Sequence, residues 1–90
     1  MLSPKRRTIS EQVLIELIEA DIEAGFNLVD VARADSCRGD AAFSRRALLE
    51  AEQVARDIEQ RLEQLDQRQN VAFDALLKEL RREIDTAKAA

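Results

Sequence analysis

The chain has 90 residues, 14 basic and 18 acidic side chains and a net charge of −4, which is the size of one domain. Helix-forming Ala, Leu, Glu, Arg and Gln dominate, and no window alternates apolar and polar residues for long, so the fold class predicted is all-α. The sequence contains no histidine, which removes the commonest general base and most transition-metal sites. We therefore expect no enzyme, no catalytic residue, no metal and no cofactor.

Charge is unevenly distributed along the chain. Residues 1–8 include three bases and no acid, and we expect them to form a flexible basic N-terminus. Residues 8–35 carry seven acids and one base. Because an acidic helix repels phosphate, and because no basic stripe with interleaved aromatics occurs, we expect no nucleic-acid partner.

The first predicted helix covers about residues 9–35. Thr8 and Glu11 have the spacing of a capping box, which marks a helix start. Gly39 is a suitable stop residue, and Asp40 can cap the helix that follows. Since the connection is short, the first two helices should form an antiparallel hairpin.

The second predicted helix covers about residues 41–65, with one apolar stripe and one charged face. A polar run from Asp66 to Asn70 interrupts the stripe, and a third helix is predicted over about residues 71–87. The fold expected is a three-helix bundle in one domain, 1–90. The alternative is a single continuous helix over 41–87, whose uncovered stripe would require a second chain, as in a coiled-coil dimer.

Apolar residues of the first helix span roughly 220° of its circumference, more than one neighbouring helix needs. Leu17, Ala24, Leu28 and Val31 line one edge, and a second edge lies well round the helix. One edge can pack on the second helix, while the other must be covered by the third helix or by a partner. The partner-binding residues predicted on this basis are Ile15, Asp21, Ile22, Phe26 and Val29.

Asp21 is the one charge placed within this apolar arc. A buried carboxylate requires a partner or a raised pKa. We expect either an internal ion pair, with Arg81 as a candidate, or a polar anchor that selects a bound helix.

Cys37 is the only cysteine, so no internal disulfide is possible. The most apolar segment, residues 13–18, contains Glu16 and is too short to span a bilayer. No export signal is apparent. We therefore expect no membrane partner and a cytoplasmic location.

Ser44, Leu48 and Ala51 follow Gly39 with small, large and small side chains. This spacing resembles the second helix of a tetratricopeptide (TPR) unit, and it is equally similar to that of a microtubule-interacting-and-transport (MIT) domain. The resemblance covers about residues 28–58 and implies a helical hairpin that offers a groove to a helical or extended peptide.

The function predicted is a non-catalytic protein-interaction module that binds a partner helix or peptide in a groove. Two alternatives remain open. One is a structural protein that self-assembles as a homodimer through the first helix. The other is a small acidic regulatory subunit that masks a basic partner, in which case binding should depend strongly on salt.

Overall fold

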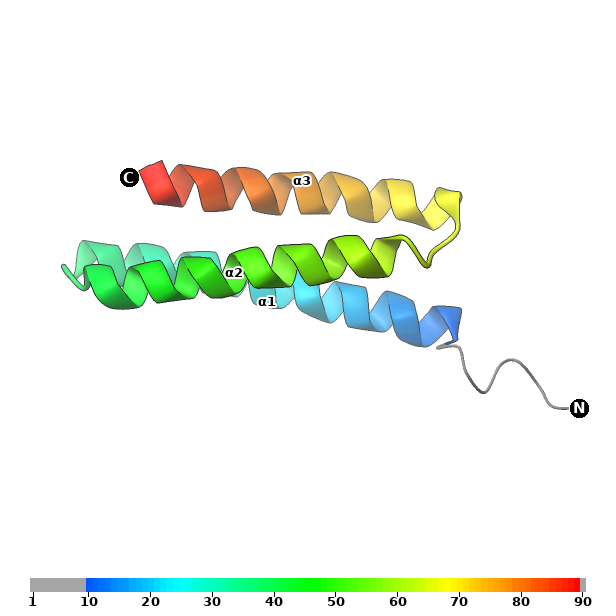
Figure 1. Cartoon of the computed structure of the whole chain (residues 1–90), viewed down its shortest axis with the longest axis horizontal. Helices are drawn as coiled ribbons and strands as arrows, with labels where there is room; N and C mark the ends of the chain where they lie inside the picture. The colour runs from blue at the N-terminus through cyan, green and yellow to red at the C-terminus, as the bar shows by residue number, and fades with distance from the viewer. Residues whose placement is uncertain (1–9, 90) are drawn as a thin grey trace, which may run out of the picture.

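The computed structural model describes residues 10–89, which form three α-helices and no strand. They are α1 (Glu11–Cys37), α2 (Ala41–Leu62) and α3 (Gln67–Ala89). The three run up, down and up, so that α1 and α3 point the same way (Figure 1). The bundle is elongated along the direction of its helices (Figure 1). An all-α, three-helix fold is thus confirmed, and the alternative of one continuous second helix is excluded.

The N-terminus of α1 is capped by Ser10, whose Oγ accepts a hydrogen bond from the Val13 backbone N–H at 3.2 Å. The helix therefore begins two residues later than the predicted start at residue 9. The proposed capping residue Thr8 and the basic segment 1–8 lie outside the described residues. Ser10 replaces Thr8 as the cap because its extended backbone, with φ −62° and ψ 152°, presents the hydroxyl to the first free amides.

The turn between α1 and α2 is short and has the residues predicted for it. Gly39 adopts a positive φ of 82°, a conformation that suits glycine because it has no Cβ. Its neighbour Asp40 caps α2 by accepting from the Phe43 N–H at 3.3 Å. The Asp40 N–H in turn donates to the Asp35 carbonyl at 2.8 Å, which closes the end of α1.

The second connection differs from the prediction. Helix α2 ends at Leu62 and α3 begins at Gln67, so most of the polar run assigned to a loop is the first turn of α3. Asp66 accepts from the Gln69 N–H at 3.0 Å. Asn70 Nδ2 donates to the Leu62 carbonyl at 2.8 Å. These polar side chains satisfy free backbone groups at two helix ends, so they start a helix instead of interrupting one.

All three helices contribute to one core. Ile18 of α1, Ile58 of α2 and Leu80 of α3 are fully buried. Gly25 allows α1 to approach α3 closely, because a Cβ built on it would lie 2.7 Å from Leu80 Cδ2. A smaller cluster of Ala32, Ala47 and Leu48 closes the bundle near the α1–α2 turn. Residues of the wide apolar arc of α1 thus pack against both α2 and α3 within the chain.

Ion pairs join the helices at their edges. Arg33 of α1 pairs with Glu83 of α3 at 2.6 Å, and Arg81 of α3 pairs with Glu59 of α2 at 3.0 Å. These pairs are largely exposed and contribute little to stability individually. No helix within residues 10–89 has both the length and the apolarity needed to cross a membrane.

Candidate functional site

The residues predicted to bind a partner lie mostly inside the bundle. Ile22 and Val29 belong to the core, and Ile15 and Phe26 are partly buried against it. Arg33, seven residues after Phe26 and therefore on the same side of α1, pairs with Glu83 of α3. The helix that covers this edge is α3 of the same chain, so a docking face for another protein must be sought elsewhere.

Asp21 pairs with Arg61 of α2, through its Oδ2 and the arginine Nη1. Both side chains are partly exposed, 26% for Asp21 and 33% for Arg61. The predicted candidate partner, Arg81, pairs with Glu59 instead, because it lies on the side of α3 that faces α2. Asp21 is thus an internal ion-pair residue, which corrects the choice of partner but agrees with the structural interpretation of this carboxylate.

The side of α1 that faces away from α3 carries an apolar stripe that no described segment covers. Its residues are spaced by four, three, four and seven positions along one line of the helix, and the exposed Asn27 lies on this line between the last two. Val13 is 45% exposed and Val31 is 48% exposed, and the two alanines are also exposed, while the leucine is partly buried. We call this set the outer stripe: Val13, Leu17, Ala20, Ala24 and Val31.

Acidic side chains follow the outer stripe on the side away from α2. Glu16, Glu23 and Asp30 are spaced by seven residues, so they form a line parallel to it, and all three are exposed. We call them the acidic row. Glu16 accepts a hydrogen bond from Gln12 at 3.2 Å. Among residues 10–89, neither Glu23 nor Asp30 has an ion-pair partner.

Helix α2 supplies a second acidic rim to the same side of the molecule. Asp57 and Glu50 precede Arg61 by four and eleven residues, which places them on the side of α2 that carries Arg61. Arg61 reaches Asp21 of α1, so this side of α2 adjoins the outer stripe. Phe43, seven residues before Glu50, is 56% exposed at the turn end, where Arg46 lies over its ring at 5.7 Å.

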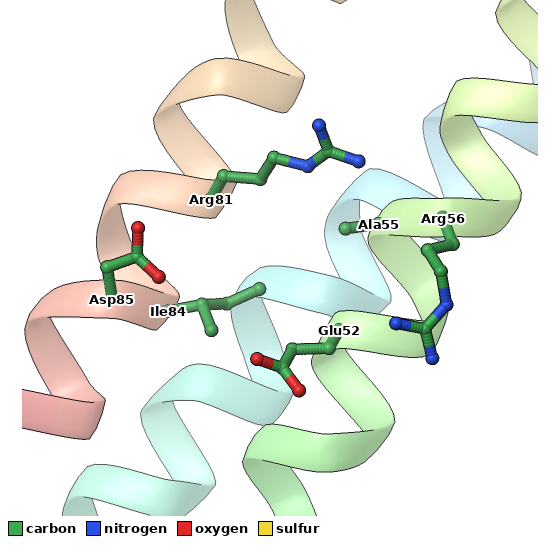
Figure 2. Close-up of a pocket in the computed structure, with 6 residues that line it drawn as sticks. All are labelled: Glu52, Ala55, Arg56, Arg81, Ile84 and Asp85. Atoms are coloured by element: carbon green, nitrogen blue, oxygen red, sulfur yellow. The ribbon is translucent and has the colours of Figure 1, made fainter.

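A separate cleft of about 250 Å³ lies between α2 and α3. Figure 2 shows Arg81 of α3 and Glu52 of α2 each reaching toward the opposite helix, and Arg56 and Asp85 also line the cleft. Two of these charges are engaged in ion pairs across the two helices, Glu52 with Lys88 and Arg81 with Glu59. The pKa of Lys88 is raised, first by its hydrogen bond to Glu52 and then by the charge of that carboxylate. The charged side chains around this cleft therefore serve chiefly to join α2 to α3.

The described residues contain no group of three or more side chains placed to bind a metal ion. Cys37 is a free, exposed thiol at the end of α1. It borders a cleft of about 270 Å³, which is also lined by Ala32, Arg33, Ser36 and Ala87.

Only part of the outer stripe is predicted from the sequence. Leu17, Ala24 and Val31 belong to one predicted edge of the apolar arc, but the partner-binding residues are predicted mainly on the other edge. The signal that identifies the outer stripe is the line of Glu16, Glu23 and Asp30 running beside apolar positions at the same spacing.

Comparison of the chain with protein-family models, with curated proteins and with solved structures finds no match.

Proposed function

We propose that this chain is a non-catalytic protein-interaction module that binds a helix of another protein along the outer stripe of α1. The observation that carries the proposal is the exposure of Val13, Ala20, Ala24 and Val31 along this stripe, whereas the apolar residues on the opposite side of α1 are buried or partly buried. An apolar line with four- and three-residue spacing is what a partner helix requires for its own side chains. The alanines allow that helix to approach closely.

Other features are consistent with this function. The core is formed by residues of α1 that lie outside the outer stripe and pack against α2 and α3. The stripe is therefore not required for folding of the chain. The resemblance of residues 28–58 to a TPR or MIT hairpin implies a groove for a peptide, and it stays a prediction. A cytoplasmic location is part of the proposal, since the single cysteine gives no indication of a disulfide framework.

The experiment is proximity cross-linking in cells of the source organism, with the full chain and two variants. Val31→Glu places a charge on the outer stripe. Leu49→Glu is the matched control, because Leu49 is 59% exposed on α2. Both positions are exposed, so neither variant should change the melting temperature by much.

A protein that is cross-linked by the natural chain and by Leu49→Glu, but lost with Val31→Glu, supports the proposal. Equal cross-linking by all three chains, or none with any, overturns it. Solution mass measured by light scattering over a dilution series separates the main alternative. A dimer that persists on dilution and is dissociated by Val31→Glu would favour the self-assembling structural protein.

A further inference from the structure

We infer that the partner of the outer stripe is a basic amphipathic helix, with apolar residues on one line and Lys or Arg on the two flanking lines. This inference rests on the proposed function and adds the chemistry of the partner. It follows from the charges that border the stripe on both sides.

The border formed by α1 is purely acidic. The acidic row, Glu16, Glu23 and Asp30, runs beside the stripe for two heptads, and all its members are exposed. A helix seated on the stripe would place its own flanking side chains opposite this row, as in coiled coils, where such positions select partners by charge. Three unpaired or weakly engaged carboxylates at a seven-residue spacing are complementary to cations at the same spacing.

The border formed by α2 carries two carboxylates between the turn end and Arg61. Glu50 is exposed and Asp57 is partly buried, with Asp57 accepting a hydrogen bond from Gln53 at 3.1 Å. Of the two bases on this side, Arg61 is paired with Asp21, whereas Arg46 keeps its charge at the turn end, where it lies over the Phe43 ring. A docked helix would therefore meet carboxylates on both of its flanks.

The same charges argue against a second copy of the chain as the occupant. If two copies met through their outer stripes, each acidic row would face either the row of the other copy or its Glu50 and Asp57. Carboxylates would oppose carboxylates in either orientation, and juxtaposed like charges are costly at an interface. A chain with a net charge of −4 also repels itself at longer range.

The test uses two synthetic 25-residue helical peptides as probes, with Leu and Ala at the same a and d positions. One peptide has Lys at every e and g position, and the other has Glu. Binding to the full chain is measured by fluorescence anisotropy at 50 and 500 mM NaCl. We expect the Lys peptide to bind roughly tenfold or more tightly than the Glu peptide at low salt, with the difference shrinking at high salt.

Two variants of the chain test whether the acidic row itself binds the Lys peptide. Changing Glu16, Glu23 and Asp30 together to their amides should weaken binding of the Lys peptide roughly tenfold. The control changes three acids away from the stripe to their amides, the exposed Glu63 and Asp85 and the partly buried Glu79, and should leave binding within about twofold.

The outcomes distinguish this inference from the proposed function. If both peptides bind equally and Val31→Glu abolishes binding, the docking face stands and the inference about charge is overturned. If the Lys peptide binds but Val31→Glu has no effect, the peptide is held by nonspecific charge attraction. Both the proposed docking face and the inference about the charge of its partner are then overturned. If neither peptide binds, or if the two triple variants weaken binding equally, the inference is overturned.

Discussion

Leu80 of α3 lies directly against the backbone of Gly25 in the middle of α1, where a Cβ would approach its Cδ2 to 2.7 Å and its Cδ1 to 3.2 Å. Leu80 is fully buried, so its methyl groups have little room to move aside. Glycine is otherwise unfavourable inside a helix by about 1 kcal/mol relative to alanine. The close contact between α1 and α3 is therefore made at the expense of helix propensity.

Gly25→Ala should lower the free energy of unfolding by about 1 kcal/mol, because overpacking outweighs the gain in helix propensity. In a Leu80→Ala background, where the obstructing methyl groups are gone, the same change should stabilise by up to about 1 kcal/mol. Urea denaturation of the four proteins in this double-mutant cycle measures both effects. A stabilising Gly25→Ala in the natural background would contradict the close contact. Ala24→Gly, at the exposed neighbouring position, calibrates the propensity difference in α1.

The ion pair between Asp21 and Arg61 should contribute measurably to stability, since removing Asp21 leaves a partly buried guanidinium without its partner. Asp21→Ala is expected to lower the free energy of unfolding by about 1 kcal/mol. Asp30→Ala is the control, because Asp30 is exposed on the same helix and should change stability by less than about 0.5 kcal/mol. An unchanged or higher melting temperature for Asp21→Ala would rule out a structural role for this pair.

The fold class and the number of helices could be predicted from the sequence because they depend on local signals. Gly39 and Asp40 form a stop and a cap whose geometry depends only on neighbouring backbone, and both act as predicted. The start of α3 could not be predicted in the same way. Asp66 and Asn70 are equally suited to a loop and to a helix N-terminus, and the choice depends on the Leu62 carbonyl that Asn70 contacts.

The candidate site was harder to predict because it depends on which helix covers which edge of α1. Periodicity identified two apolar edges, but the covering of Ile22 and Phe26 by α3 results from tertiary packing, including the Gly25–Leu80 contact. The partner of Asp21 likewise depends on the register of α1 against α2. Sequence spacing contains no information on that register, and so Arg61 was not identified.

Gln69 provides a further test, because its Oε1 is buried and has no hydrogen-bond partner among the described residues. An unsatisfied buried acceptor reduces stability by about 1 kcal/mol or more. Gln69→Met retains the length and helix propensity of the side chain but removes this acceptor, and it should raise the free energy of unfolding by about 1 kcal/mol. Gln67→Met, at an exposed position two residues earlier, should have almost no effect in the same urea denaturation. A loss of stability with Gln69→Met would mean that the oxygen is hydrogen-bonded in solution.

The Lys88–Glu52 pair near the C-terminal end of α3 predicts that the pKa of Lys88 depends on Glu52. Pairing raises the pKa of Lys88 in the folded protein above its ordinary value of 10.5, through the hydrogen bond to Glu52 and its charge. A raised pKa in the folded state means that the contribution of the pair is complete below pH 10.5 and is lost as pH rises through the folded-state pKa. An NMR titration of the Lys88 side chain should therefore have its midpoint above 10.5 in the natural chain and closer to 10.5 in Glu52→Gln. Glu59→Gln, which removes the partner of Arg81 instead, should leave the Lys88 midpoint unchanged. A midpoint that does not respond to Glu52→Gln would show that the ammonium and the carboxylate are not paired in solution.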